Sequence, residues 1–410
     1  MAARDRTRSR LLARRGEFTE VPVDPRMKLL VFAHVPPPHH GQSQMVQYLV
    51  EGFQQHPGLG IEVIHVDARL SEDLTDVGSA RGGKLPRLLG YCWQALRARF
   101  AEGVTTWYYV PSPPKRNSLY RDWVVLLLVR PWFRQTIFHW HAVGLGEWLE
   151  SSARPWERWI TRRLLGRVDL AITLSAFNSP DALRLHPSRS EVVANGVPDP
   201  CPDFNAVLAV NRRQRALERR SGGIVRVLFL AHCTRDKGVF DALEAIAQAN
   251  AAEAAQADPN RLRFTLDVAG TFVTAEEEAA YRERVARPDL AGCVRTLGFV
   301  SGAAKAACLR DADLFLFPSY FANEGQPLNL IEAMAHGLPP VTTRWRGIPE
   351  MLPTDYAGLV PSRDPTAAAE ALRNVARTED GLRFREAFQS RFGLEAHLQC
   401  LAAVLRSVER

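Results

Sequence analysis

Short apolar runs rich in β-branched residues alternate with helical stretches along most of this chain, and this alternation limits the possible folds more than any other feature. In the first half, the pattern predicts strands at 28–35, 61–67, 105–110, 136–142, 169–175 and 190–197. The predicted helices between them are 43–53, 85–100, 120–129 and 157–165. Alternation on this scale predicts parallel sheets with helices on both faces.

The alternation of strands and helices is interrupted at residues 203–223, where a polar, basic segment ends in Gly222-Gly223. It resumes after this segment. The second half predicts strands at 225–231, 264–270, 293–300, 313–319 and 339–343, and helices at 238–252, 275–286, 303–308 and 328–336. A chain of 410 residues is too long for one core, so two α/β domains are expected. The predicted division is a basic disordered tail (1–25), a first domain (26–203), a linker or inserted helix (204–223) and a second domain (224–383).

Two apolar stretches need a separate interpretation. Residues 85–100 carry large apolar side chains at near-helical spacing, namely Leu88, Leu89, Trp93, Leu96 and Phe100. The longest apolar run, 123–129, is far shorter than the ~20 residues that span a bilayer. We interpret it as a buried helix segment and predict no transmembrane span.

The excess of positive charge is compatible with three classes of partner. Lys and Arg total 52 against 45 Asp and Glu, a net charge of +7, which suits nucleic acid, an anionic membrane surface or a phosphorylated ligand. The Arg-rich N-terminus lacks the apolar segment of a signal peptide. Its simplest interpretation is a solvated tail, and the alternative is an electrostatic contact with anionic lipid. The six cysteines form no CxxC pair, which argues against a zinc site and favours a reducing cytoplasm.

The densest motif lies at residues 318–343. A strand is predicted to end at Phe317, and a helix begins near Pro327 after a short loop. A helix N-terminus offers free N–H groups and a partial positive charge, which suits a phosphate. Glu324 precedes this helix and Glu332 lies inside it, where their carboxylates can accept hydrogen bonds from sugar or ribose hydroxyls. Without the surrounding motif, the pair is equally well explained by Glu324 as a charge that interacts with the helix dipole and Glu332 as an exposed charge on the helix.

The whole string resembles the E-x7-E signature of the retaining glycosyltransferases of family 4, the group 1 glycosyltransferases with the GT-B fold. The residues that match the family pattern in order are Pro318-Ser319, Glu324-Gly325, Glu332–Ala335, Gly337 and Pro339. Further matches are Ala194–Val197, Lys237-Gly238, Leu297–Val300 and Gly347–Glu350. The resemblance covers residues 27–408. It implies two doubly wound Rossmann-like domains facing a central cleft, with the last helices (384–410) crossing back onto the first domain.

The resemblance also implies a division of labour. The second domain would bind a nucleotide-sugar, with Glu332 on the ribose, Glu324 on the sugar and Lys237 neutralising the diphosphate leaving group. His141, at the end of a predicted strand, would face the donor sugar. Strand alternation directs His139 to the same side of the sheet as His141, and we expect His139 to be a packing residue. Catalytic roles thus fall to His141, Lys237 and Glu324. The expected donor-binding set is Gly41, His232, Arg235, Lys237, Gly298, Phe299, Val300, Glu324, Gly325, Gln326, Leu328, Asn329 and Glu332.

The sequence departs from the family pattern at two places. The family often has Gly-Arg where this chain has Ala231-His232, and histidine is a poorer phosphate partner than arginine. Arg235 either substitutes for that arginine or faces solvent. The family's EGFG is EGQP here, and Pro327 lacks an N–H, which leaves the amides of Leu328 and Asn329.

Gly41 takes the place of the family's Gly-rich loop, either beside the ligand or in an ordinary strand-to-helix turn. No metal or cofactor is expected. Asp311-Ala-Asp313 has the DxD spacing of a metal motif, but Asp313 opens a strand that reads as buried.

We therefore expect a retaining, metal-independent glycosyltransferase that moves a sugar from a UDP- or GDP-sugar to a hydroxyl acceptor in polysaccharide or glycolipid assembly. The family allows a lipid-linked acceptor and a location in the cytoplasm or at the inner face of the membrane. The alternative is a non-catalytic two-domain protein that binds a nucleotide-sugar or another anion. Nucleic acid is not expected as a partner, because the chain lacks a helix-turn-helix or an RNP-like aromatic motif.

Overall fold

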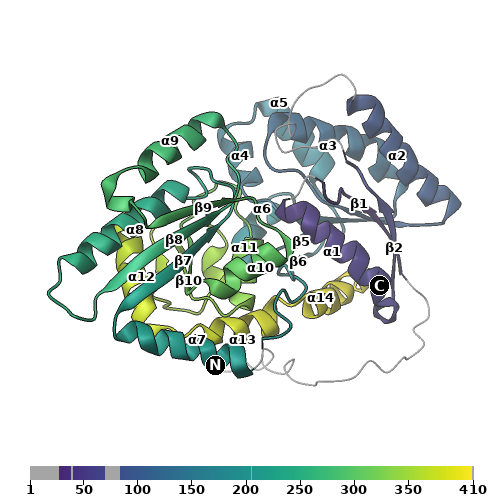
Figure 1. The fold of residues 1–410 in the computed structure, drawn as a ribbon. Coiled ribbons are helices and arrows are strands. Elements are labelled where there is room, and N and C mark those ends of the chain that lie inside the picture. Colours follow the sequence, from purple (N-terminus) through teal and green to yellow (C-terminus); the bar gives the residue numbers. More distant parts are fainter. Residues whose placement is uncertain (1–26, 38–39, 70–83, 205, 409–410) are drawn as a thin grey trace, which may run out of the picture.

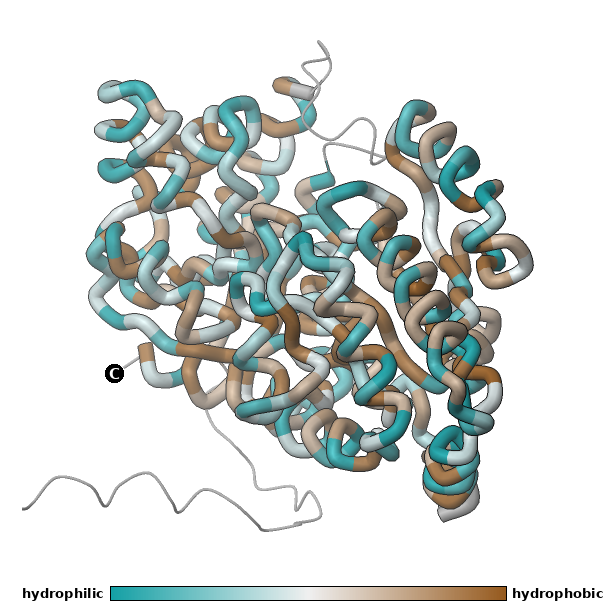
Figure 2. Tube along the Cα trace, turned by 90° about the vertical axis from the view of Figure 1, so that its left-hand side faces the viewer, coloured by the Kyte–Doolittle hydropathy of each residue, from teal (hydrophilic) through white to brown (hydrophobic). Residues whose placement is uncertain are grey.

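The computed structural model describes residues 27–37, 40–69, 84–204 and 206–408. The predicted tail at 1–25 lies outside the described residues. Two parallel six-stranded sheets with helices on their faces make up the structure, as the alternating pattern predicts (Figure 1). Apolar residues concentrate on the strands and polar residues on the outer helices (Figure 2).

The first sheet has the strand order β2-β1-β3-β4-β5-β6, with all neighbouring strands parallel. Its strands are β1 (Met27–Phe32), β2 (Ile61–Val66), β3 (Thr106–Tyr109), β4 (Gln135–Trp140), β5 (Leu170–Thr173) and β6 (Ser190–Val192). The helices in this part of the chain are α1 (Gly41–Gln55), α2 (Lys84–Ala101), α3 (Arg116–Val129), α4 (Leu145–Ser151), α5 (Pro155–Leu165) and α6 (Ser179–Leu183).

Side chains that alternate along the strands supply two separate cores. Leu30 and Phe32 of β1 pack with residues of α2 and α3 on one face of the sheet. Leu29 and Val31 point to the opposite face, where they pack with residues of α1 and of α14 (Leu394–Arg406). The last helix of the chain therefore covers the first sheet.

The second sheet has the order β12-β11-β10-β7-β8-β9, again all parallel. Its strands are β7 (Gly223–Leu230), β8 (Leu262–Ala269), β9 (Val294–Gly298), β10 (Leu314–Phe317), β11 (Pro340–Thr343) and β12 (Leu359–Val360). The helices of this half are α7 (Ala206–Arg220), α8 (Val239–Ala254), α9 (Ala275–Val285), α10 (Gly302–Asp311), α11 (Leu328–Ala335), α12 (Pro365–Thr378) and α13 (Leu382–Arg391).

Strand order reverses direction once in each sheet. The chain moves outward from β1 to β2 and then returns to add β3 on the other side of β1. In the second sheet it moves from β7 through β8 to β9 and returns to add β10 beside β7. In open α/β sheets, ligands bind beyond the carboxyl ends of the strands at such a reversal. The loops after β1, β7 and β10 are therefore the structural candidates for a site.

Helix α7 occupies most of the segment for which the sequence allows a linker or an inserted helix. Arg212 and Arg219 of this helix are buried, although the segment reads as polar and basic. Arg212 donates to the carbonyl oxygens of Leu309 (2.9 Å) and Ala312, while Arg219 donates to Ala376 O at 3.0 Å. These cations hold α7 against the C-terminal ends of α10 and α12, and burial lowers the pKa of Arg212 to about 9.

Asp313, the second acid of the DxD pattern, is also used structurally. Its carboxylate lies 3.3 Å from the Arg219 guanidinium and 3.4 Å from that of Arg215, and it accepts the Arg226 amide at 3.0 Å. The side chain is 5% exposed. All three of these contacts are with residues of the second half of the chain, at the start of β10 and not at its carboxyl end, where a ligand is expected.

The two apolar stretches singled out in the sequence are only partly buried. In α3, Val125 and Leu126 are buried but Leu127 and Leu128 are exposed. Of the five large apolar residues predicted on helix α2, only Leu88 is in the core; its helical spacing is as predicted. Among the described residues, no helix has both the length and the apolar character needed to cross a bilayer.

Candidate active site

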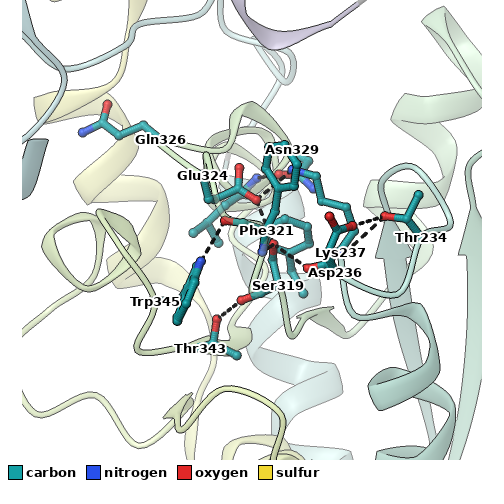
Figure 3. A network of polar contacts seen from close by, with 12 residues as sticks. Thr234, Asp236, Lys237, Ser319, Phe321, Glu324, Gln326, Asn329, Thr343 and Trp345 are labelled. Carbon is teal, nitrogen blue, oxygen red and sulfur yellow. Dashed lines mark hydrogen bonds and ion pairs between the residues drawn. The ribbon is translucent and has the colours of Figure 1, made fainter. Parts of the chain in front are cut away.

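The loops after β7 and β10 lie side by side because their strands are neighbours, and they bring Lys237 to Glu324. The Lys237 ammonium lies 2.8 Å from the Glu324 carboxylate, and the two side chains are 19% and 7% exposed. Ser319 donates its hydroxyl to the same carboxylate oxygen at 2.8 Å. The ammonium also lies 4.4 Å from the centre of the Phe321 ring (Figure 3). An ordered ion pair thus sits at the strand-order reversal of the second sheet.

Backbone contacts hold these two loops in register. Tyr320 N donates to Asp236 O at 2.8 Å, which joins the two loops. The Trp345 side chain, from the loop after β11, supports the loop after β10 by donating its Nε1 to Phe321 O at 2.8 Å. Gly238 follows Lys237 with φ of +84°, and a Cβ there would lie 2.3 Å from Pro318 O. Only glycine fits both the left-handed conformation and this close approach. The glycine therefore explains why Lys237 can reach across to the loop after β10.

Glu332 lies one turn into α11, the helix that the sequence predicts after this loop. Its carboxylate is 2.6 Å from the Lys305 ammonium of α10. Burial and the charge of Glu332 raise the pKa of Tyr48, on α1, to about 12. Glu332 therefore pairs with a cation of its own half, and its charge acts on a tyrosine of the first half of the chain.

The first sheet contributes His141 to the same region. A Cβ on Gly325 would lie 2.6 Å from His141 O, so the backbones of these two residues are in direct contact. The rings of His139 and His141 are 4.3 Å apart, which agrees with the expected orientation to one side. His139 is buried and hydrogen-bonded to Tyr108 Oη. Burial, together with the charges of His397 and His40, lowers the pKa of His141 to about 3, so its ring is neutral near pH 7.

Gly41 is the first residue of α1 and faces the N-terminus of α11. A Cβ on Gly41 would be 3.9 Å from the Leu328 side chain. The N-terminal ends of α1 and α11 therefore meet here, one from each half of the chain. Two helix N-termini that converge favour an anion between them.

Two members of the predicted donor-binding set are directed elsewhere. The Arg235 guanidinium lies 4.4 Å from the Phe240 ring, in a depression of about 370 Å³ between α8 and α9. Gln326 points away from the Lys237–Glu324 pair (Figure 3). Its side chain accepts from Asn195 N and donates to Leu174 O, both at 2.8 Å. In this structure Arg235 does not join the cation at Lys237, and Gln326 links the two halves of the chain.

The other predicted residues follow the carboxyl ends of the strands. His232 comes after β7, and burial and the Lys237 charge lower its pKa, which makes it a neutral partner rather than a second cation. Asn329 donates to Leu230 O at 2.6 Å, so its side chain joins α11 to the end of β7. Gly298 ends β9, followed by Phe299, which is 65% exposed, and by the half-buried Val300.

Some residues of the site were not singled out by sequence reasoning. Ser319 belongs to the matched Pro-Ser pair, but no role followed from it. Lys305 and Tyr48 approach Glu332 from separate helices, and nothing in their local sequence indicates this. Among the described residues, no group of three or more His, Cys, Asp and Glu side chains is arranged to hold a metal ion.

Comparisons with known proteins show what this chain is similar to. Residues 225–378 match the family model of the group 1 glycosyl transferases. The whole fold superposes on that of HepE from Anabaena, solved with UDP and glucose, with a TM-score of 0.64 at 16% identity over 93% of this chain and all of that chain. It also superposes on sucrose-phosphate synthase from Thermosynechococcus elongatus, with a TM-score of 0.67 at 18% identity over 93% and 99% of the two chains. The chain therefore has the GT-B fold, and residues 225–378 are similar to the group 1 glycosyl transferases.

Curated relatives match a smaller part of the chain. The amylovoran biosynthesis glycosyltransferase AmsK of Erwinia amylovora is 32% identical over 160 residues, which is 38% of this chain and 37% of AmsK. The colanic acid biosynthesis glycosyltransferase WcaL of Salmonella typhimurium is 31% identical over 195 residues, 45% of each chain. The chain thus matches less than half the length of these relatives.

The buried histidines predict a loss of stability in mild acid. Burial lowers the pKa of His336 and of His397 to about 4. The unfolded chain, with a histidine pKa of about 6.5, binds more protons than the folded chain between these values. Each histidine then removes about 1.4 kcal/mol of unfolding free energy for each pH unit below about 6.5. Urea unfolding midpoints at pH 7.5, 6.5 and 5.5 should fall in that order.

A pair of variants separates this effect from general acid sensitivity. His397→Asn should flatten the pH dependence, whereas His186→Asn should leave it unchanged. His186 is exposed and has φ of +52°, a conformation that asparagine tolerates. Midpoints that stay constant down to pH 5.5 would contradict the assignment.

Proposed function

We propose that this protein is a retaining glycosyltransferase of family 4 that transfers a sugar from a nucleoside-diphosphate sugar to a hydroxyl group. The observation that carries the proposal is the Lys237–Glu324 ion pair, held beside the N-terminus of α11 at a strand-order reversal. A cation and a helix N-terminus together favour a diphosphate, and a carboxylate beside them can accept hydrogen bonds from a sugar. The matched group 1 domain and the names of its relatives point the same way.

Each residue has a role in this reaction. Lys237 and the Leu328 and Asn329 amides stabilise the negative charge that grows on the leaving diphosphate. Glu332 accepts hydrogen bonds from the ribose, and Glu324 accepts them from the donor sugar. The exposed Phe299 ring offers a surface for the base. His141, which is neutral and follows β4 of the first sheet, contacts the donor sugar from the opposite side of the site.

The chemistry is a single exchange at the anomeric carbon. The bond from this carbon to the diphosphate oxygen breaks, and its bond to the acceptor oxygen forms on the same face. The acceptor proton passes to the departing phosphate. The lysine supplies the positive charge that a metal supplies in other enzymes, so we propose that no metal is required.

The proposed setting is polysaccharide or glycolipid assembly at the cytoplasmic side of a membrane. AmsK and WcaL, by their names, act in the biosynthesis of amylovoran and colanic acid. HepE was solved with UDP and glucose, which favours a UDP-sugar as the first donor to test, with a GDP-sugar second. A lipid-linked hydroxyl acceptor fits such a pathway.

The first experiment identifies the donor by its binding and then measures whether the protein transfers the sugar. Thermal unfolding is followed with UDP, GDP, ADP and their sugars, since a ligand at 100 times its dissociation constant adds about 2.7 kcal/mol. The stabilising donor is then incubated with candidate acceptors, with and without EDTA, and free nucleoside diphosphate is measured. Release that needs the acceptor and survives EDTA supports the proposal. Binding without release with any acceptor favours the non-catalytic alternative, and activity that returns only with Mn²⁺ contradicts the metal-free mechanism.

Substitution of Glu332 and substitution of Glu324 should affect different quantities, nucleotide affinity in the first case and kcat in the second. We expect Glu332→Ala to weaken nucleotide binding by about 10–100-fold, because hydrogen bonds to a charged group are lost and Lys305 loses its partner. Glu324→Ala should lower kcat more than it lowers nucleotide affinity, since its proposed contact is with the sugar. Calorimetric titration with the nucleotide and steady-state kinetics measure the two effects separately.

Glu370→Ala serves as the matched control. Glu370 is an exposed carboxylate on α12, and this variant should bind and turn over as the unmodified protein does. If Glu332→Ala and Glu324→Ala both behave like this control, the site assignment is wrong.

A further inference from the structure

Three loops of the first sheet meet at its carboxyl edge. Strand β1 lies between β2 and β3, so the segments that follow these three strands are neighbours. His34 follows β1, Arg69 follows β2, and Ser112 follows β3. The site described above adjoins this edge, because Gly41 at the start of α1 faces Leu328 of α11. The roles proposed above use none of the polar side chains on these three loops.

The hydrogen bonds of two histidines determine where their protons lie. Ser43 N donates to His40 Nδ1 at 3.3 Å, so this nitrogen carries no proton and His40 Nε2 carries one. His40 Nε2 lies 2.9 Å from His34 Nε2 and donates to it. The proton of the neutral His34 ring is therefore on Nδ1. Within the described part of the chain, this N–H group has no hydrogen-bond partner.

Arg69 approaches His34 from the loop after β2. Its guanidinium donates to Pro36 O at 3.2 Å and to the Asp67 carboxylate at 2.7 Å, which holds it against the loop after β1. The side chain is 30% exposed, so a ligand can reach it. Its Nε is buried and is not hydrogen-bonded to any described residue. Such a donor remains to be paired.

Arg121 of α3 approaches from the loop after β3. Its guanidinium donates to the Ser112 hydroxyl and lies 3.2 Å from the Asp122 carboxylate. Asp122 is buried, and it accepts from Tyr109 Oη at 2.9 Å and from Ser112 N at 2.8 Å. A carboxylate with these fixed partners holds the arginine in one place. The arginine side chain is 39% exposed, and its Nη1 makes no hydrogen bond with a described residue.

The charges around His34 are matched to a singly charged anion. We call His34, Arg69 and Arg121 the His34 cluster. Burial and the charges of Arg121 and Arg69 lower the pKa of His34 to about 4, so its ring is neutral near pH 7 and lies in a positive field. Each arginine is already paired with one acid, Asp67 or Asp122. The unpaired groups are thus all N–H donors, without the excess charge that a phosphate dianion needs. A carboxylate fits such a set.

We propose that the His34 cluster binds a carboxylate on the acceptor, so that the acceptor sugar is a uronic acid. His40 connects the cluster to the site. Its ring centre lies 4.9 Å from that of His34, and its charge contributes to the lowered pKa of His141. A hexuronic acid bound here by its carboxylate carries hydroxyl groups on the same ring, and these would face His141 and the donor sugar. The inference rests on the proposed function only in naming the ligand as the acceptor.

Binding of uronic acids can be measured without donor or transfer. Saturation-transfer NMR is recorded with the full chain and the methyl glycosides of glucuronic, galacturonic and mannuronic acid. Each is compared with the neutral glycoside that has a hydroxymethyl group in place of the carboxylate, and with that glycoside phosphorylated on the hydroxymethyl group. We expect at least one uronide to bind about tenfold more tightly than its neutral match, because hydrogen bonds to a charged group are strong. The phosphorylated glycoside should bind more weakly than the uronide.

Variants of the cluster should remove this preference. Arg69→Gln and Arg121→Gln should each lower the affinity for the uronide by about tenfold and leave that for the neutral glycoside unchanged. His34→Phe keeps a ring but loses the N–H donor and should act in the same way, whereas His34→Gln keeps a donor and should retain part of the preference. Thermal unfolding of each variant shows that it is folded. If Arg121→Gln unfolds because Asp122 loses its cation, Arg69→Gln and His34→Phe decide the question.

The matched control is Arg189→Gln. Arg189 is paired with Glu191 two positions later, as Arg69 is paired with Asp67 two positions earlier. Arg189 precedes β6 and so lies at the opposite edge of the same sheet. This variant should bind the uronide as the unmodified protein does.

Three results would overturn the proposal. They are equal binding of each uronide and its neutral match, a preference for the uronide that survives in both Arg69→Gln and His34→Phe, and tighter binding of the phosphorylated glycoside. Failure of the proposed function is recognised separately, since it appears as absence of transfer with every donor and acceptor. Uronide binding that the cluster variants lose supports the carboxylate site in either case.

Discussion

Lys237→Met is expected to lower kcat by about 10²–10³-fold while the protein remains folded. The lysine supplies the only charge that the loop after β7 directs at Glu324, since His232 is neutral near pH 7 and Arg235 lies over Phe240. Methionine keeps much of the volume beside the Phe321 ring but carries no charge. The loss should appear in kcat because the charge on the diphosphate grows as the bond breaks.

Steady-state kinetics with the donor found by thermal unfolding measures this effect. Lys28→Met is the control, because Lys28 lies near the start of β1, at the opposite end of the strand from the site, and its ammonium donates to Glu102 O at 3.0 Å. This control should retain its kcat. A Lys237→Met enzyme with unchanged kcat would refute the role of this lysine in stabilising the leaving group.

Gly325→Ala is expected to lower the rate of transfer by about 100-fold, since an error of about 1 Å in position can have that effect. A Cβ at this position would lie 2.6 Å from His141 O and 3.2 Å from Leu174 Cδ1. Neither backbone can move without separating the loop after β10 from the end of β4. The methyl group therefore separates Glu324 from His141, the two proposed contacts to the donor sugar.

Nucleotide affinity should change much less than transfer, because Lys237, Glu324 and Glu332 all belong to the second half of the chain. Calorimetric titration and kinetics of the same sample measure this difference. Gly58→Ala is the control, since a Cβ there meets nothing within 4 Å. Equal losses in nucleotide affinity and in transfer would show that the variant disturbs the second half itself.

Most of the fold follows from local patterns. Buried strands such as β7 and β10 are short, mainly apolar runs between loop residues, and this pattern is enough to predict them. The short helices α4 and α6 and the two-residue strand β12 were not predicted, because they have too few residues to show a period. The basic segment at 206–220 is a docked helix, since its arginines find buried carbonyl groups that a linear pattern does not reveal.

The candidate site was predictable in its parts. The motif placed Glu324 and Glu332 around a helix start and placed Lys237 before another helix, as observed. Their partners were not predictable. Ser319 is five residues from Glu324, but Lys305 is 27 residues from Glu332, and only the tertiary fold brings these two side chains together.

The sequence by itself determined the α/β class, the two repeats of alternating strands and helices, and the motif that resembles the group 1 signature. These depend on residue type and spacing over short distances, which local backbone geometry decides. The tertiary structure alone decided the directions of side chains. Gln326 joins the two halves, Arg235 turns to Phe240, and Trp93 remains in solvent, because each depends on neighbours that are far away in the sequence.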